Sequence, residues 1–202
     1  MQLTDKERDV FTAIERDREE AIGFLRRSIE LDPLTPFPRF YIAFAQELSG
    51  RLDDAQQGYR RALELSPGYE PASGALVRLE LARGNTTEAI AAAKRAVEEN
   101  PAAANLTTLG VAFALTGRRN EAHTLLTRLR DLGRQRWVSP YERARVEAAL
   151  GDRTPALADL RAAIEARDFR VPELKVRADI EFRRLLADPE FEQLVAGIGR
   201  RD

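Results

Sequence analysis

Apolar residues recur along the chain at intervals of three and four, the spacing of one face of an α-helix. Examples are Leu25 with Ile29 and Leu76 with Leu79. No window alternates strictly between apolar and polar residues as a half-buried strand does, and no strand–helix–strand pattern occurs. The pattern therefore predicts an all-α chain.

Four sets of residues repeat along the chain with a period of 33 or 34 residues. The first set is Ala21, Ala55, Ala89, Ala122 and Ala156; the second is Ser28, Ala62, Ala96, Leu129 and Ala163; the third is Leu25, Tyr59, Ala93, Leu126 and Leu160; the fourth is Gly50, Gly84, Gly117 and Gly151. A period of this length is typical of stacked helix–turn–helix units. We expect each unit to be one helical hairpin.

Each set has a physical role in such a hairpin. Two antiparallel helices approach closely where a small side chain lies at their crossing, which the alanines supply. A glycine ends the first helix, because it adopts the left-handed conformation without steric cost. The second helices of the first three units end before Pro33, Pro67 and Pro101. Later units have Arg134 and Asp168 there, which predicts less defined turns.

Capping motifs support these helix boundaries. Ser139-Pro140-Tyr141-Glu142 places Ser at the N-cap, Pro at the first helical position and Glu at the third. Asn85-Thr86-Thr87-Glu88 and Thr4-Asp5-Lys6-Glu7 have similar spacing. We expect helices to begin at these points.

The order of small, glycine, apolar and proline positions resembles the tetratricopeptide repeat. It is clearest in the series Ala43, Gly50, Ala55, Tyr59, Ala62 and Pro67. The resemblance implies a right-handed α-solenoid of about five hairpins over residues 2–168, with units starting near Gln2, Pro36, Glu70, Ala103 and Trp137. The first unit is degenerate, because Arg8 and Asp9 fall where the family has an apolar and a small residue.

Residues 169–202 leave the repeat and predict a helical capping segment packed on the last unit. Their Asp188-Pro189-Glu190-Phe191 motif resembles a tail that follows tetratricopeptide units in bacterial regulatory proteins. The likeness implies a regulatory context. One hypothesis is therefore that the chain is a structural or self-associating module that acts on an enzyme or transcription regulator in the same chain or operon. In this hypothesis the chain could form a homo-oligomer.

The leading hypothesis is a non-enzymatic adaptor or scaffold. In the family that this chain resembles, extended peptides or helices bind a concave groove lined by the first helix of each unit. Carried over position by position, the resemblance implies a protein-binding site formed by Phe37, Phe40, Tyr41, Phe44, Arg78, Tyr141 and Arg145. The partner is a protein or peptide whose identity the sequence does not give.

Six of these seven residues allow two interpretations each. Phe37, Phe40, Tyr41 and Phe44 share one helix face, so they either pack into a neighbouring helix or contact a ligand. Arg78 and Arg145 could bind a partner carboxylate or remain solvated. The Asn and Lys of the family's carboxylate clamp for chaperone tails are missing apart from Lys6, which argues against that role.

Composition removes several other classes of protein. The chain has no Cys, one His and a formal net charge of -1, which leaves no disulfide framework or cysteine zinc site, and we expect no metal and no cofactor. The first twenty residues are too charged for a signal peptide, and no apolar run could span a membrane, so we expect a cytoplasmic protein.

One stretch of the chain is basic. It contains six arginines and only two acidic residues, Glu121 and Asp131. The arginines are Arg118, Arg119, Arg128, Arg130, Arg134 and Arg136. They could meet an acidic partner, but the negative remainder of the chain and the lack of interleaved aromatics argue against nucleic acid. His123 lies in the same stretch without a base or nucleophile near it in sequence, which supports the view that the chain is not an enzyme.

Overall fold

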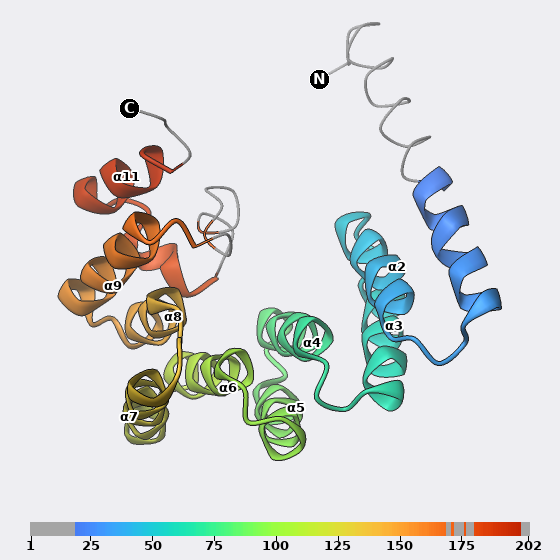
Figure 1. Cartoon of the computed structure of the whole chain (residues 1–202), viewed down its shortest axis with the longest axis horizontal. Coiled ribbons are helices and arrows are strands. Elements are labelled where there is room, and N and C mark those ends of the chain that lie inside the picture. The colour runs from blue at the N-terminus through green and yellow to red at the C-terminus, as the bar shows by residue number, and fades with distance from the viewer. Residues whose placement is uncertain (1–18, 169–170, 172–175, 177–179, 199–202) are drawn as a thin grey trace, which may run out of the picture.

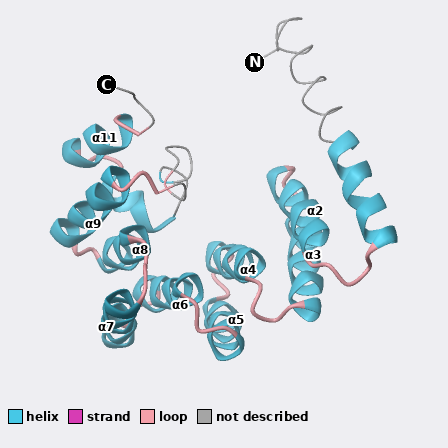
Figure 2. Ribbon diagram, viewed as in Figure 1, coloured by secondary structure: helices cyan, strands magenta, loops and turns pink. Residues whose placement is uncertain are grey.

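The chain forms a curved stack of antiparallel helices in a computed structural model (Figure 1). The structure describes residues 19–168, 171, 176 and 180–198, and within these ranges it contains helices and loops but no strand (Figure 2). The predicted all-α solenoid of helical hairpins is confirmed. The expected first helix of unit one, with Lys6, Arg8 and Asp9, lies outside the described residues.

Four complete hairpins follow one another in the described chain. They are α2 (Phe37–Leu48) with α3 (Leu52–Leu65), α4 (Glu70–Ala82) with α5 (Thr86–Glu99), α6 (Ala103–Leu115) with α7 (Arg119–Gln135), and α8 (Pro140–Leu150) with α9 (Arg153–Glu165). Residues 19–31 are helical before them. The short 3-10 helix η1 (Ile180–Leu185) and α11 (Pro189–Ala196) come after them.

Small residues lie at the helix crossings, as the repeat predicts. Ala55, Ala89, Ala122 and Ala156 are completely buried, and Ala62, Ala96, Leu129 and Ala163 are buried as well. The α2–α3 crossing is so close that a Cβ added at Gly58 would lie 2.6 Å from the Cβ of Ala43. The prediction is wrong for unit one, because Ala21 is exposed and the adjacent Ile22 is buried instead.

Glycines end the first helix of each complete hairpin. Gly50, Gly84, Gly117 and Gly151 have φ values between +74° and +81°, the left-handed conformation that residues with a Cβ adopt at a steric cost. The prediction for this set is confirmed. Arg134 lies inside α7, which continues to Gln135, so the chain does not turn at the position where the earlier units have a proline.

Of the three predicted capping motifs, the one at Thr4 lies outside the described residues, and the other two behave differently. The Ser139 hydroxyl accepts a hydrogen bond from the Tyr141 N–H at 3.0 Å and caps α8 as predicted. Asn85 also stands directly before its helix, but its side chain makes no cap. Its Nδ2 instead donates to Oε2 of the buried Glu80 at 2.8 Å, because a buried carboxylate needs donors more than an exposed helix end does.

The C-terminal segment packs on the last hairpin. Phe182 of η1 lies between Tyr141 of α8 and Phe191 of α11, with ring centroids 5.9 and 5.8 Å apart. Asp188 accepts hydrogen bonds from the N–H groups of Glu190 and Phe191 and so caps α11. The boundary between repeat and cap near residue 169 stays a prediction.

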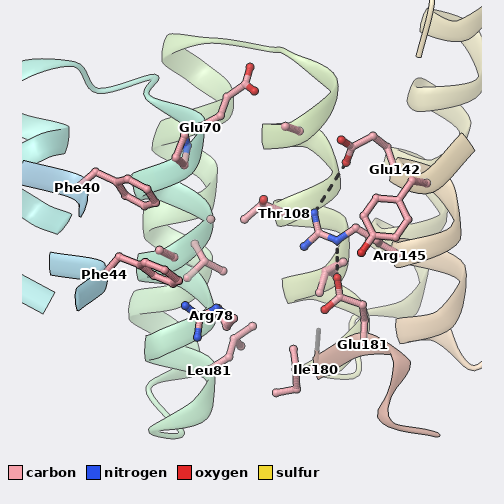
Figure 3. Close-up of a pocket in the computed structure, with 17 residues that line it drawn as sticks. Phe40, Phe44, Glu70, Arg78, Leu81, Thr108, Glu142, Arg145, Ile180 and Glu181 are labelled. Carbon is pink, nitrogen blue, oxygen red and sulfur yellow. Dashed lines mark hydrogen bonds and ion pairs between the residues drawn. The ribbon is translucent and has the colours of Figure 1, made fainter. Parts of the chain in front are cut away.

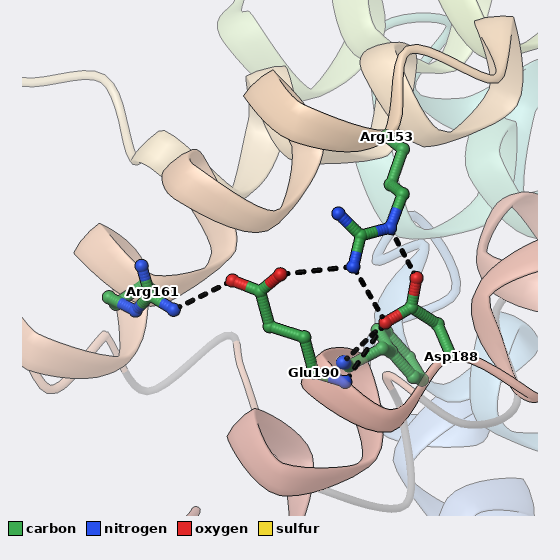
Figure 4. A network of polar contacts seen from close by, with 5 residues as sticks. Arg153, Arg161, Asp188 and Glu190 are labelled. Atoms are coloured by element: carbon green, nitrogen blue, oxygen red, sulfur yellow. Dashed lines mark hydrogen bonds and ion pairs between the residues drawn. The ribbon is translucent and has the colours of Figure 1, made fainter.

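An exposed ionic network joins α9 to the N-terminal end of α11 (Figure 4). Arg153 of α9 binds Asp188 and Glu190, and Arg161 binds Glu190 at 2.9 Å. The hydrogen bond from Arg153 outweighs the smaller effect of burial and lowers the pKa of Asp188. None of the described helices is long and apolar enough to cross a membrane.

The buried crossings generate a stability prediction. Ala96→Phe should lower the free energy of unfolding by about 1 to 3 kcal/mol or more, because the enlarged side chain overpacks the crossing of α5 with its neighbours. Urea unfolding followed by circular dichroism measures the change. Ala91→Phe, at an exposed position of the same helix, is the control and should change stability little. Equal stability of the two variants would contradict the packing described here.

Candidate functional site

An open cavity of about 370 Å³ lies along the first helices of the hairpins (Figure 3). We call it the groove. Its described lining comes from α2, α4, α6, α8 and η1, and includes Phe40, Phe44, Glu70, Gly74, Ala75, Arg78, Leu81, Ala104, Thr108, Val111, Tyr141, Glu142, Arg145, Ile180 and Glu181. The second helices α3, α5, α7 and α9 contribute none of its lining residues. The groove therefore follows the helices that the family resemblance indicated.

Small residues form the floor of the groove. Gly74 and Ala75 come from α4, and Ala104 and Thr108 come from α6. A Cβ added at Gly74 would meet only the Thr108 Oγ1, at an ordinary contact distance of 3.7 Å. Packing within the chain thus does not require a glycine here, and its missing side chain leaves room in the groove.

The four aromatic side chains of α2, which we call the aromatic stripe, do not all lie in the groove. They are Phe37, Phe40, Tyr41 and Phe44. Phe40 and Phe44 line the groove, whereas Phe37 and Tyr41 do not. Phe40 is half-buried and lies 5.8 Å from the Tyr59 ring and 6.0 Å from the Tyr69 ring, so it belongs to the packing of the hairpin. Phe44 is 38% exposed and stacks on Phe40. The stripe is therefore part core and part open wall.

Phe37 and Tyr41 lie outside the groove. They are 52% and 42% exposed, and their ring centroids are 4.6 Å apart. The structure thus leaves these two rings as an exposed pair beside the groove and does not bring them together with Arg78, Tyr141 and Arg145.

Arg78 binds a carboxylate of its own chain. Its two terminal nitrogens donate to Oε1 and Oε2 of Glu47 at 2.5 and 2.8 Å, and the Tyr59 hydroxyl donates to the same Oε2 at 2.6 Å. This cluster joins α2, α3 and α4. Burial alone would raise the pKa of Glu47, but the hydrogen bonds from Arg78 and Tyr59 outweigh it and lower that pKa. Burial and the Glu47 charge raise the pKa of Tyr59.

Arg145 is held in a similar way on the opposite wall. Its Nε donates to Oε1 of Glu181 in η1 at 2.5 Å, and its Nη1 lies 3.8 Å from Oε2 of Glu142. Both carboxylates are almost completely buried. The solvated alternative does not fit, because Arg78 and Arg145 each pair with carboxylates of their own chain. Their role in binding a partner carboxylate stays untested.

Tyr141 differs from what its assignment to the site implied. It borders the groove but is only 1% exposed, and its ring stacks on Phe182. The side chain is therefore mainly core. Conversely, Ile180 and Glu181 line the groove from beyond the repeat, where the sequence offered no register that would place them.

The described residues contain no group of three His, Asp or Glu side chains arranged to hold a metal ion. His123 is exposed on α7. Arg130 and Arg134 of the basic stretch are joined by Trp137 and Arg143 around a second, shallower hollow. Each of these three arginines pairs with a carboxylate, namely Glu147, Asp131 and Asp159 respectively. The local positive charge is thus largely compensated.

The family comparison agrees with this geometry. Residues 47–109 match the family described as the tetratricopeptide repeat. This segment is a tetratricopeptide repeat region. It runs from the end of α2 into α6, and so contains Gly74, Arg78 and Thr108 of the groove. No curated protein matches the chain.

Solved structures share the fold. A thermophilic tetratricopeptide protein of Thermus thermophilus is 22% identical, with 83% of this chain covering 92% of that one at a TM-score of 0.57. PilW, described as a widely conserved type IV pilus biogenesis factor, is 17% identical, with coverage of 92% and 94% and a TM-score of 0.53. At these identities the likeness establishes the fold alone.

The division of the aromatic stripe can be tested by truncation. Phe40→Ala should lower the free energy of unfolding by about 1 to 3 kcal/mol, because its ring fills space against Tyr59 and Tyr69. Phe44→Ala and Tyr41→Ala should each cost less than about 1 kcal/mol, since these rings are substantially exposed. Thermal or urea unfolding of the three variants checks the order. Equal losses for all three would show that the stripe is not divided in this way.

Glu147 predicts a pH dependence. Its side chain is buried on α8. Burial and the charge of Asp159 raise the pKa of Glu147 to about 7, although Arg130 and Arg143 act to lower it. The folded protein therefore binds this proton more tightly than the unfolded chain, so its contribution to stability falls as pH rises from about 4.5 to 7.

Glu147→Gln should remove that loss. Across this pH window, wild-type stability should fall relative to that of the variant by roughly 1 to 3 kcal/mol. Urea unfolding at a series of pH values measures both proteins. Glu165→Gln, at an exposed position of α9, is the control and should follow the wild type. Parallel curves for wild type and Glu147→Gln would refute the assignment.

Proposed function

We propose that this protein is a non-enzymatic interaction module that binds a segment of another protein in the groove. The observation that carries the proposal is the open space above Gly74, bordered by apolar side chains on both walls. Concave surfaces with apolar walls and a few fixed polar groups are the usual form of binding sites. A helix or extended segment laid across first helices would use this surface along its length.

The side chains that line the groove have two different roles. Phe44, Leu81 and Ile180 are partly accessible apolar side chains that can cover a partner's anchors. Each large anchor fully removed from water contributes about 1.5 to 3 kcal/mol, so two or three anchors offset much of the cost of association. Phe40, Arg78 and Arg145 shape the walls, because each is held by neighbours in its own chain.

The groove chemistry supports binding over catalysis. Its described lining contains no histidine, cysteine or serine, and Arg78 and Arg145 are engaged by carboxylates of the same chain. A hydrolytic or acid–base site would require a nucleophile or a carboxylate directed at a substrate together with a partner that activates it.

A second candidate is self-association or a structural role in a larger assembly. Large apolar side chains are exposed at the N-terminal end of the described solenoid, namely Phe24, Leu31, Leu34, Phe37 and Leu48. Contiguous exposed apolar surface is typical of interfaces between proteins. Light scattering over a hundredfold concentration range tests this candidate, and a constant monomeric mass would exclude self-association.

Gly74→Leu tests the groove directly. The leucine should occupy the open space and reduce affinity for groove-binding peptides at least tenfold, while stability stays equal or rises by roughly 1 kcal/mol because Leu favours helix more than Gly does. Peptides selected on the wild-type protein from a random displayed library serve as probes in fluorescence anisotropy. Gly23→Leu makes the same change at an open helical position outside the groove and should leave affinity unchanged. Full binding by Gly74→Leu would overturn the proposal.

A further inference from the structure

Two hairpins of the described chain carry a buried glutamate at the same position of the repeat. Glu80 of α4 and Glu147 of α8 lie 67 residues apart in the sequence, and each residue is 1% exposed. The turn after each glutamate has the same backbone hydrogen bond. The N–H of Asn85 donates to the Glu80 carbonyl at 2.9 Å, and the N–H of Asp152 donates to the Glu147 carbonyl at 2.9 Å. The surroundings of the two carboxylates can therefore be compared residue by residue.

At the first site both carboxylate oxygens have donors. Gln56 and Arg60 donate to Oε1 of Glu80, and Asn85 Nδ2 donates to Oε2 at 2.8 Å. The second oxygen is thus satisfied by the side chain of the turn. Hydrogen bonds of this kind favour the charged form of a carboxylate.

At the second site one oxygen has no donor. Arg130 Nη2 donates to Oε1 of Glu147 at 3.0 Å, but Oε2 is buried and accepts no hydrogen bond from the part of the chain that the structure describes. The turn here carries Asp152, whose carboxylate accepts hydrogen bonds and does not donate them. Asp152 instead accepts from Arg119 at 3.4 Å. An aspartate therefore stands where the equivalent turn supplies an amide.

Charged groups approach Glu147 from several of the elements that pack against α8. Among the described residues they are Arg130 of α7, Arg143 of α8 itself, Asp159 of α9, and Asp152 with Arg119 at the turn. The helix α6 contributes no charged residue, and η1 contributes Glu181, Arg183 and Arg184, of which Glu181 pairs with Arg145 at the groove.

These surroundings favour the protonated form of Glu147. Burial, followed by the charge of Asp159, raises the pKa of Glu147 to about 7. Arg130 and Arg143 act in the opposite direction, but Arg143 also donates two hydrogen bonds to Asp159. A buried neutral carboxyl costs less than a buried charge with one oxygen unpaired. Glu147 therefore holds its proton at a pH where carboxyl groups are ordinarily ionised.

We propose that Glu147 is a regulatory proton-binding site, created by Asp152 at the position where the equivalent turn has an amide. The helix α8 packs against α7, α9 and η1 (Figure 1). Loss of the proton leaves an incompletely paired charge between these elements, so it destabilises the last hairpin and the segment docked on it. The site controls this end of the solenoid, and the inference does not depend on what the groove binds.

Carbon-13 NMR of the glutamate carboxyl groups measures this proton directly. The labelled protein is titrated from about pH 4 to about pH 9, and the resonance absent from Glu147→Gln identifies Glu147. Its midpoint should lie near pH 7 in the wild type. In Asp152→Asn it should fall by roughly one pH unit or more, because the new amide can donate to Oε2 as Asn85 does for Glu80. A wild-type midpoint near the ordinary glutamate value, or an unchanged midpoint in Asp152→Asn, would overturn the proposal.

Asp152→Ala is the matched control for the amide. It removes the same carboxylate without supplying a donor, and it removes no helix cap, since the Asp152 side chain makes no capping hydrogen bond to α9. The midpoint of Glu147 should stay near the wild-type value. An equal fall in Asp152→Ala and Asp152→Asn would mean that the charge of residue 152 sets the proton affinity, and the proposed role of the amide would be wrong.

Amide hydrogen exchange tests the regulatory consequence. After correction for the intrinsic pH dependence of exchange, protection of α8 and α9 should fall about tenfold or more between about pH 5 and about pH 8. It should fall much less in Glu147→Gln and in Asp152→Asn. The hairpin of α4 and α5, where Asn85 is present, is the control within the same molecule. Protection that stays constant in α8 and α9, or falls equally in both hairpins, would contradict a regulatory role for this proton.

Discussion

The close crossing of paired helices at small residues is the constraint on which the rest of this structure depends. Where α2 meets α3, the space between Gly58 and Ala43 does not admit one more Cβ. The same buried alanines recur in every described hairpin, so each unit adopts a similar geometry and stacks on the next. Because one side of each first helix is used in these crossings, the other side remains to line the groove.

Ionic links between units then fix the shape of the groove. Glu47 and Arg78 connect α2 to α4, and Arg145 and Glu181 connect α8 to η1. The second link makes the C-terminal segment part of the groove wall in addition to covering Phe182 and Tyr141. Arginines that would serve as ligand contacts in another setting here hold the walls of the groove in place.

Much of the fold could be predicted because it is local and repeated. The period of 33 or 34 residues placed the glycine turns, the buried alanines and the first helices that carry the groove. Two positions deviate from the local rules that were applied to the sequence. Asn85 donates to the buried Glu80 instead of capping its helix, and α7 continues through Gly133 and Arg134 to Gln135.

The site was less predictable, because pairing across helices is not periodic. Nothing in the spacing of Arg78 or Arg145 indicates that Glu47 and Glu181 reach them, since Glu181 lies beyond the repeat. Likewise, the position of Tyr141 in its unit suggests the groove, but the stack with Phe182 draws its ring into the core. The sequence could thus identify the surface, while the charges available on it required the structure.

Amide chemical-shift mapping tests the central claim most directly. The wild-type protein, labelled with nitrogen-15, is titrated with a peptide selected from the random library. The account predicts that the largest shifts fall along the groove, at Gly74, Thr108 and Arg145, and that Ala91 on the exposed face of α5 does not shift. Shifts centred on Ala91 or on Trp137, with the groove unaffected, would contradict it.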